Sequence, residues 1–566
     1  MKIRFKEFVP KSFICFREGY TTKTFYHDLF AGVCVGIIAI PLALAFAIAS
    51  GVSPEKGLAT AIVAGFLISF LGGSRVQIGG PTGAFVVIVY TIVAKFGYEG
   101  LALATLIAAL LMILMGMMRL GSLLKFIPHP VTVGFTTGIA LVIFSSQIKD
   151  FLGLQISSLP PEFLEKCIVY SKHLHTWNLW AFVIALSTLL CIALLKRYFP
   201  RFPGTMLAIG LATVATTFFH LPIETIGSKF GTITQVLPKP SLPNFSLELF
   251  FAVFPSALTV ALLGAIESLL SASVADGMTG NKHRSNCELV AQGLANLGSV
   301  LFGGIPATGA IARTSANIKM GARTPISGMI HALTILFFML FLSPLVSKIP
   351  MAALSSVLVF VAWNMSELPH FIEILKGQKG DAIALLATFI LTVLIDLTVA
   401  VQVGVLLSAV IFLKRMTDRT TLGIYRILKE DNQDEKPQIH KEQSLSHQKI
   451  PSEIAVFELN GPFFYSVSHL LDEALVQLQT PPKAFVLCLH KTPLIDSTGQ
   501  RAIKQFSLKC KQKNITFLIA GAKVDLFRKS NLEDYVGKQH IFPTMDLALT
   551  AAKEYVGSLT EKLNSH

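Results

Sequence analysis

The sequence predicts an all-α polytopic membrane domain followed by a small α/β domain. Three observations lead to this fold class. Of the 566 residues, 52% are hydrophobic and only 14% are charged, whereas soluble domains carry roughly 25% charged residues. Long stretches without any charged residue recur as far as Leu413. After Leu413 the composition turns abruptly polar.

Uncharged stretches divide the membrane domain into spans. A helix needs roughly 17 to 25 apolar residues to cross the hydrocarbon. Stretches of about this length lie at 29–54, 57–74, 76–94, 101–118, 130–148, 177–195, 249–266, 289–312, 324–347, 349–366, 382–395 and 397–413. With 202–219 added and the region 268–312 divided, we predict about 14 spans. The N-terminal segment lacks a continuous apolar core, so no cleaved signal peptide is predicted.

The distribution of Lys and Arg predicts the orientation in the membrane. The loops of one side and the N-terminal tail carry Lys2, Arg4, Lys6, Lys11, Arg17, Lys23, Arg75, Arg119, Lys125, Lys196, Arg197, Arg201, Lys282, Arg284, Lys319, Arg323, Lys376 and Lys379. The opposite loops carry fewer cations: Lys95, Lys149, Lys166, Lys172, Lys229, Lys239 and Lys348. Because cytoplasmic loops hold the excess of Lys and Arg, we expect both termini in the cytoplasm and the chain in a bacterial inner (cell) membrane.

Charge and cysteine usage exclude several classes of function. The net charge of +14 is explained by topology and by attraction to anionic membrane lipid, so nucleic-acid binding is not predicted. The seven cysteines show no metal-ligand spacing. Only Cys167 would lie in an external loop, so we expect no structural disulfide. The sequence indicates no metal and no cofactor.

A polar linker and a soluble domain follow the membrane domain. We expect the membrane domain to cover residues 1–416, the linker 417–450 and the soluble domain 451–566. Strand-like EIAVFEL and AFVLCLH flank the amphipathic stretch SVSHLLDEALVQLQ, and a second helix over 498–512 precedes the strand ITFLIAG. This alternation predicts a sheet covered by helices.

Two similar interruptions break the apolar pattern of the membrane domain. GGPTGAF occupies residues 79–85 and GGIPATGAIAR occupies residues 303–313, although Gly and Pro least favour a helix interior. Transporter folds often consist of two inverted halves. Two halves of about seven spans fit the spacing, and because seven is odd, the second half must be inverted. The two interruptions would then enter from opposite sides.

Helices that begin inside the membrane would form an anion site. Non-helical backbone at bilayer depth is tolerated only where protein or a water-filled cavity satisfies its polar groups. Half-helices that begin near Gly83 and near Thr308 to Ala310 would each present roughly half a positive charge and free N–H groups. The predicted substrate-binding residues are Thr82, Gly83, Ala84, Thr308, Gly309, Ala310 and Arg313. The alternative is that Gly and Pro merely kink packed helices.

The chain resembles the sulfate permease (SulP) family of anion transporters. The resemblance rests on PLALAFAIASGVSPEKGL, GGPTGAF, the long segment GAIESLLSASVADGMTGNKHRSNCELVAQGLANLGSVLFGGIPATGAIART, and DSTG near the C-terminus, in this order. It implies two inverted seven-span repeats divided into a core and a gate domain, and an elevator-like motion. It also implies a cytoplasmic STAS domain that contributes to a homodimer.

Glu267 is the clearest ionisable residue within the predicted spans. It follows the uncharged run 249–266 and precedes SLLSASVA, and a charge at such depth usually faces a cavity or a partner. Burial disfavours the ionised carboxylate, so Glu267 is the predicted proton carrier. A structural ion pair with Arg313 is the alternative. In similar family members that use sodium, an aspartate replaces Glu267 and a threonine replaces Ile311, which disfavours sodium coupling here.

In the soluble domain, IDSTG at residues 495–499 follows a strand and opens a helix. In STAS proteins that resemble this one, the hydroxyl residue of the motif can be phosphorylated, which makes Thr498 the candidate and Ser497 the second choice. A phosphate there would lie at a helix N-terminus. N-capping by Asp496 or Ser497 is the alternative.

The sequence therefore predicts a secondary active transporter of a small anion, coupled to protons through Glu267. Sulfate, bicarbonate and dicarboxylates remain open as substrates. A passive anion channel or an anion exchanger on the same fold is the alternative, followed by a nucleobase permease of related architecture and a membrane-anchored sensor. No nucleophile, metal cluster or phosphate loop indicates an enzyme.

Overall fold

The computed structural model describes residues 7–121, 128–156, 159–160, 162–199, 203–231, 236–243, 246–395, 397–425, 450–464, 470–478, 481–521 and 536–564. The chain divides into two compact units, Met1–Ser408 and Ala409–His566. The predicted cations Lys2, Arg4, Lys6, Lys125 and Arg201 lie outside the described residues, as does most of the predicted linker.

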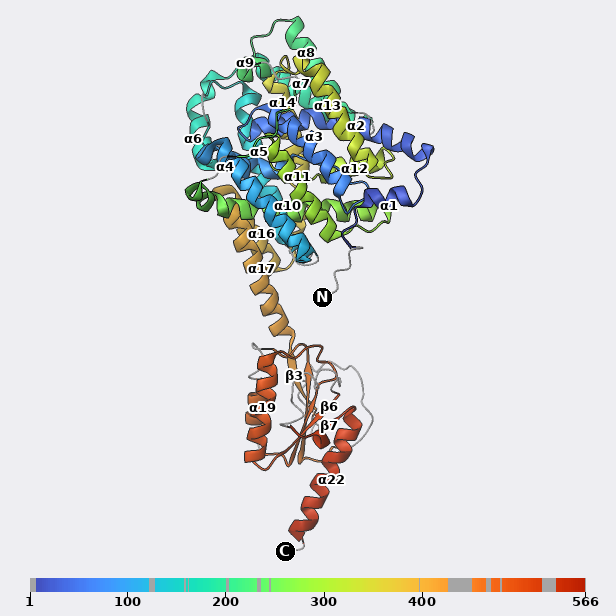
Figure 1. The fold of residues 1–566 in the computed structure, drawn as a ribbon. Coiled ribbons are helices and arrows are strands. Elements are labelled where there is room, and N and C mark those ends of the chain that lie inside the picture. Colours follow the sequence, from blue (N-terminus) through green and yellow to red (C-terminus); the bar gives the residue numbers. More distant parts are fainter. Residues whose placement is uncertain are drawn as a thin grey trace. The chain divides into compact units, whose positions relative to one another are not determined.

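The first unit is helical (Figure 1). Its helices are α1 (Lys11–Arg17), α2 (Thr22–Ala49), α3 (Pro54–Leu71), α4 (Gly83–Met117), α5 (His129–Leu152), α6 (Phe163–His173), α7 (Leu179–Tyr198), α8 (Gly204–Phe218), α9 (Ile226–Phe230), α10 (Leu247–Thr279), α11 (Ser285–Leu301), α12 (Ile311–Lys319), α13 (Ile326–Val346), α14 (Met351–Met365), α15 (Leu368–Lys376), α16 (Lys379–Leu394) and α17 (Leu397–Arg419), which continues into the second unit.

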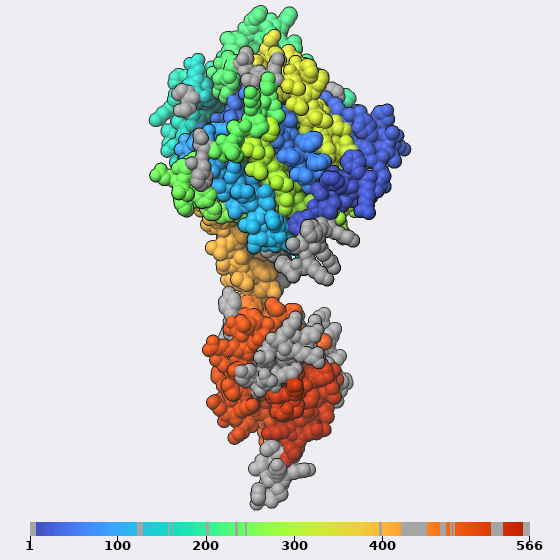
Figure 2. Space-filling model, in the orientation of Figure 1, coloured from blue at the N-terminus to red at the C-terminus, as the bar shows by residue number. Residues whose placement is uncertain are grey.

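Nine helical stretches of the described residues are long and apolar enough to cross a membrane. The other predicted spans correspond to shorter helices and to the second part of α4, which bends at Gly97, where φ is +67°. That backbone conformation is open to glycine and strained for other residues. Exposed apolar side chains such as Phe30, Phe337 and Phe341 cover the outer faces of α2 and α13. These helices lie side by side, blue and yellow in Figure 2, as expected for surfaces that face lipid.

The two Gly-Pro interruptions meet inside the first unit. Strand β1 (Gly79–Gly80) pairs antiparallel with β2 (Thr308–Gly309), so that Gly79 lies opposite Gly309. The pairing supplies partners for backbone that no helix satisfies, and Ala310 N adds a hydrogen bond of 2.8 Å to the Ile78 carbonyl. The contact needs small residues, because a Cβ on Gly309 would lie 1.7 Å from Gln77 Nε2.

The first half-helix begins at Gly83, as predicted, with Thr82 as its N-cap residue. The second, α12, begins at Ile311, slightly later than the predicted start at Thr308 to Ala310. Thr308 and Gly309 cannot join the helix because they are paired in β2. Ala310 keeps an extended backbone with φ of −96° and ψ of 109°.

The second unit is an α/β domain. Its sheet has the order β3-β4-β5-β6-β7, in which β3 is antiparallel to β4 and the remaining neighbours are parallel. Phe457, Phe485 and Phe506 are buried on one face, and Val456, Val486 and Ala548 on the other. The elements are β3 (Thr421–Tyr425), β4 (Ile454–Asn460), α18 (Leu470–Gln477), β5 (Ala484–Cys488), α19 (Ser497–Gln512), β6 (Thr516–Ala520), β7 (Ile541–Phe542) and α22 (Met545–Asn564).

The linker predicted over 417–450 differs from the structure in its first residues. Helix α17 continues through Arg419, and Thr421–Tyr425 form an edge strand paired with β4. Backbone pairing with β4 gives this polar segment a regular structure that its composition does not indicate. Residues 426–449 lie outside the described residues.

Candidate functional site

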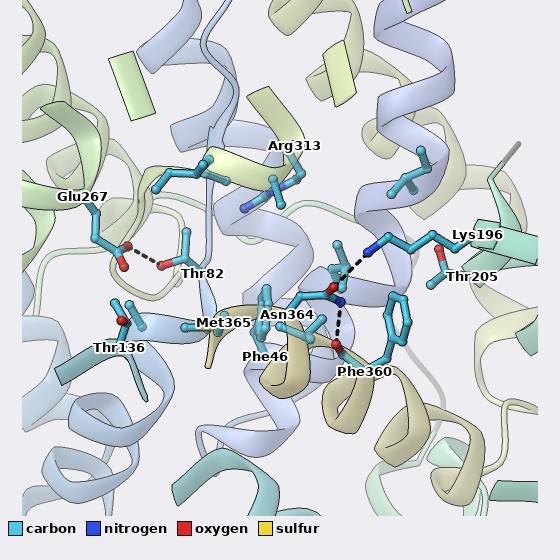
Figure 3. Close-up of a pocket in the computed structure, with 18 of the residues that line it drawn as sticks. Phe46, Thr82, Thr136, Lys196, Thr205, Glu267, Arg313, Phe360, Asn364 and Met365 are labelled. Atoms are coloured by element: carbon cyan, nitrogen blue, oxygen red, sulfur yellow. Dashed lines mark hydrogen bonds between the residues drawn. The ribbon is translucent and has the colours of Figure 1, made fainter. Parts of the chain in front are cut away.

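A cavity of 490 Å³ lies between two groups of helices in the first unit. Helices α2 and α10 and the first residues of α4 and α12 form one wall. Helices α5, α7, α8 and α14 form the other (Figure 3). The cavity therefore lies where the two half-helices begin.

All but one of the site residues predicted in the membrane domain line this cavity. The half-helices contribute Thr82, Gly83, Ala84, Gly309, Ala310 and Arg313, and α10 contributes Glu267. Thr308 is the exception. Its side chain is 0% exposed, and its hydroxyl donates a hydrogen bond of 2.9 Å to the Gly264 carbonyl. Pairing in β2 turns Thr308 toward α10, so the predicted contribution of its hydroxyl to a binding site is wrong.

Small residues let the cavity reach the backbone of both half-helices. The first N–H groups of α4 and α12 have no partner within their own helices. Gly83 and Ala84 at the start of α4, and Gly309 and Ala310 before α12, leave this backbone accessible from the cavity. A Cβ on Gly83 would lie 2.7 Å from Met365 Sδ on the opposite wall. The helix starts can therefore attract a negatively charged ligand.

Arg313 contributes a full positive charge to the same region. Its side chain is 3% exposed, and Nη2 donates a hydrogen bond to the Pro81 carbonyl. Nη1 has no hydrogen-bond partner within the described part of the chain. Buried guanidinium groups are normally paired, so Arg313, which lines the cavity, keeps one buried N–H group without a hydrogen-bond acceptor among the described residues.

Glu267 contacts the first half-helix instead of Arg313. Thr82 Oγ1 donates a hydrogen bond of 3.0 Å to Glu267 Oε2 (Figure 3), and the carboxyl is half-buried. Among the described residues, the salt bridges do not include one between Glu267 and Arg313, so the alternative of a structural ion pair is wrong for this conformation. Neither residue therefore neutralises the charge of the other in this conformation.

The polar residues of the opposite wall are not evident from the sequence pattern. Lys196 Nζ donates a hydrogen bond of 2.8 Å to Asn364 Oδ1 and lies 4.7 Å from the centre of the Phe360 ring. Thr136 and Thr205 complete this wall. The sequence predicts for Lys196 only the place of a loop cation, because no sequence pattern pairs α7 with α14.

Other buried polar groups lie outside the cavity. Glu288 is 0% exposed and accepts hydrogen bonds from the backbone of Gly73 and Ser74. Asp28 accepts equivalent bonds from Arg323 and Thr324. These carboxylates hold turns in place. Within the described ranges, no group of three or more His, Cys, Asp or Glu side chains could hold a metal ion, and the seven cysteines are free.

In the second unit, Thr498 is exposed in the first turn of α19. Asp496 caps this helix, since its Oδ1 accepts a hydrogen bond of 2.7 Å from Gly499 N. The interpretation of the motif as an N-cap is therefore confirmed for Asp496. Thr498 itself remains accessible to modification.

Comparison with known proteins agrees with this architecture. The profile of the Sulfate permease family matches residues 25–388, and that of the STAS domain matches residues 447–548. The chain is 41% identical over 534 residues to the "Putative sulfate transporter YvdB" of Bacillus subtilis, covering 94% of this chain and 98% of the relative. It is 31% identical to the "Bicarbonate transporter BicA" of Picosynechococcus sp., covering 78% of this chain and 79% of the relative.

Solved structures share the fold. The murine Slc26a9 anion transporter in its inward-facing state has a TM-score of 0.85 at 18% identity, covering 98% of this chain and 95% of that chain. The transmembrane domain of the cyanobacterial bicarbonate transporter BicA has a TM-score of 0.61 at 29% identity, covering 69% of this chain and 98% of that chain. Sequence and fold thus agree that the chain belongs to the sulfate permease family of anion transporters and carries a C-terminal STAS domain.

Proposed function

We propose that this protein is a secondary active transporter that couples the uptake of a small anion to protons. The observation that carries the proposal is the convergence of both half-helix starts and Arg313 on one cavity. Each helix start contributes roughly half a positive charge, and Arg313 adds a full one. Such a site favours a compact anion over a neutral or cationic solute.

Glu267 supplies the coupling in this proposal. An ionised Glu267 would repel an anion in the same cavity, and the repulsion is strong where water is scarce. Protonation removes the repulsion, so the proton and the anion bind together. The Thr82 hydroxyl can donate to the ionised carboxylate and accept from the protonated one, which lets Glu267 change charge without losing its neighbour.

The substrate is sulfate, bicarbonate or a dicarboxylate. Relatives named as sulfate and bicarbonate transporters support the first two. We further propose that the wall formed by α2, α4, α10 and α12 moves relative to the other wall in an elevator-like motion. The protein would act as a homodimer in a bacterial inner membrane, with both termini cytoplasmic and lipid around its apolar faces.

Counterflow in proteoliposomes tests the proposal. Labelled sulfate, bicarbonate and succinate are offered at two external pH values to the wild type, Glu267→Gln and Arg313→Ala. We expect Glu267→Gln to lose accumulation driven by a proton gradient and to keep exchange, and Arg313→Ala to raise the half-saturating anion concentration about tenfold or more.

The control is Glu248→Gln, which removes an exposed carboxyl from the first turn of the same helix. It should behave as the wild type in both assays. Normal accumulation by Glu267→Gln would refute proton coupling at this residue and leave an exchanger or a passive channel. Large unitary currents that are indifferent to pH would favour the channel.

A further inference from the structure

A second cavity of 400 Å³ lies in the first unit, away from the cavity described above. Its lining comes from α2, α4, α5, α6 and α9. Among the described residues, three lysines line it, Lys149, Lys166 and Lys229, together with one carboxylate, Asp150. We call this cavity the lysine vestibule.

The lysine vestibule continues the path of the first cavity. Along α5, Thr136 lines the first cavity, whereas Val142 and Asp150 line the vestibule. Along α2, Phe46 lines the first cavity and Ile48 lines the vestibule. Between the two levels on α5, Ile139 and Ala140 are buried and apolar. The two cavities are thus successive compartments of the boundary between the same helices, separated by an apolar layer.

Lys166 is the least paired of the three lysines. Its side chain is 3% exposed, and Nζ lies 5.4 Å from the centre of the Tyr90 ring. Its ammonium forms none of the salt bridges found in the described part of the chain. Burial lowers the pKa of Lys166 to about 8, because desolvation penalises the charged form. Lys166 is therefore mainly charged at neutral pH.

The other two lysines leave the vestibule positive overall. Lys229 Nζ lies 3.5 Å from Asp150 Oδ1, so these two charges largely cancel. Lys149 Nζ donates a hydrogen bond to the Ile156 carbonyl, which satisfies a donor without neutralising the charge. Lys149 is attracted to the carboxylates of Asp150 and Glu224, so Lys166 carries the positive charge that no described carboxylate pairs. Low surrounding polarity strengthens its attraction to an anion.

We propose that the lysine vestibule is a second anion site, through which the transported anion binds from the external side before the apolar layer opens. The proposal rests on the proposed transport function and on the predicted orientation, in which Lys149, Lys166 and Lys229 lie in external segments. The ligand is a small oxyanion or carboxylate, the same class that fits the first cavity. Lys166 would be the main contact, since no carboxylate of the described residues forms a salt bridge with it.

Initial-rate uptake into right-side-out membrane vesicles tests this site. Labelled sulfate, bicarbonate and succinate are compared in the wild type, Lys166→Gln, Lys166→Arg and Lys229→Gln. We expect Lys166→Gln to raise the external half-saturating concentration about fivefold, with little change in the maximal rate. Lys166→Arg should restore it, and Lys229→Gln should raise it as well, because Asp150 then loses its counter-ion. Efflux measured from the internal side should keep its half-saturating concentration in all variants.

The matched control is Lys172→Gln, which removes an exposed lysine from the same helix. An unchanged external half-saturation in both Lys166→Gln and Lys229→Gln, or an equal shift on both sides of the membrane, would overturn the vestibule and leave the transport proposal intact. Absence of uptake of all three anions by the wild type would overturn both proposals. If Lys166→Gln does not fold, Lys229→Gln alone decides between these outcomes.

Discussion

Thr82 and Glu267 join the first half-helix to α10 through a hydrogen bond of 3.0 Å, donated by Thr82 Oγ1 to Glu267 Oε2. The residues are separated by 185 positions in the chain, yet both line the same cavity. Thr82 precedes the free N–H groups of α4. A change in the charge of Glu267 is therefore felt directly at the proposed anion site.

Removing the Thr82 hydroxyl should weaken coupling. A hydrogen bond to a charged group contributes about 1.5 to 3 kcal/mol, and Thr82→Val loses it while keeping the side-chain shape. We expect Thr82→Val to reduce proton-driven accumulation of the anion about tenfold, and Thr82→Ser to remain close to the wild type. Equal accumulation by Thr82→Val and the wild type would show that the bond plays no part in coupling.

The fully buried Glu288 should serve stability, whereas the half-buried Glu267 should serve coupling. The oxygens of Glu288 accept bonds from Gly73 N at 2.8 Å, Ser74 N at 3.2 Å and Gln292 Nε2 at 3.0 Å. We expect Glu288→Gln to cost about 1.5 to 3 kcal/mol of folding free energy and to lower the melting temperature. The Glu288→Gln molecules that remain folded should still accumulate the anion in response to a proton gradient. Glu267→Gln should lose this accumulation while its melting temperature stays normal. Loss of coupling at normal stability in Glu288→Gln would contradict this division.

The local sequence was enough to predict that both membrane segments are interrupted and that Glu267 lies at a cavity. Gly-Gly-Pro within an apolar run has few structural interpretations, and a carboxyl at the end of an uncharged run is unusual in a membrane. The orientation of Thr308 was not predictable, because it depends on the pairing of β2 with β1 across the chain. Lys196 and Asn364 likewise meet only through the packing of α7 near α14.

Buried carboxylates with structural roles were missed for a similar reason. Asp28 lies near the start of α2 and Glu288 in the first turn of α11, where sequence suggests a solvated helix end. The structure buries both against loops from distant segments. In the second unit, the alternation of strands and helices was readable, but the edge strand β3 owes its structure to β4.

The contact between β1 and β2 should tolerate no added carbon. A Cβ on Gly309 would lie 1.7 Å from Gln77 Nε2, and Gln77 is held by its hydrogen bonds to Ser268. We expect Gly309→Ala to lower stability by about 3 kcal/mol and to abolish transport. The control is Gly210→Ala in α8, whose Cβ would meet nothing within 4 Å. Thermal unfolding followed by size-exclusion chromatography compares the two, and equal stability would contradict the close contact.

The lysine vestibule predicts that anion binding from the external side depends on pH through Lys166. Lys166 has a pKa of about 8, so its charge is present at pH 7 and largely lost at pH 9. We expect the external half-saturating anion concentration of the wild type to rise between these values, measured by exchange at equal pH on both sides. Because loss of the proton from Glu267 would also weaken anion binding as the pH rises, the comparison is made in the Glu267→Gln background, which keeps exchange. In that background Lys166→Gln should lack the rise, and Lys166→Arg should also lack it because arginine stays charged. An identical rise in Lys166→Gln would assign the titration to another group.

The first turn of α19 predicts opposite effects for two neighbouring substitutions. Asp496 Oδ1 accepts a hydrogen bond from Gly499 N at 2.7 Å. Asp496→Ala should therefore destabilise this helix by about 1 kcal/mol, whereas Asp496→Asn should retain most of the cap.

Thr498 is exposed beside the same N-terminus, where negative charge is favourable by about 0.3 to 1 kcal/mol. Thr498→Glu, which imitates part of the charge of a phosphate, should therefore slow amide exchange of α19 in the full-length protein, and Asp496→Ala should accelerate it. If Thr498→Glu accelerates exchange as Asp496→Ala does, repulsion between residues 496 and 498 outweighs the helix dipole, and phosphorylation of Thr498 would loosen the STAS domain instead of ordering it.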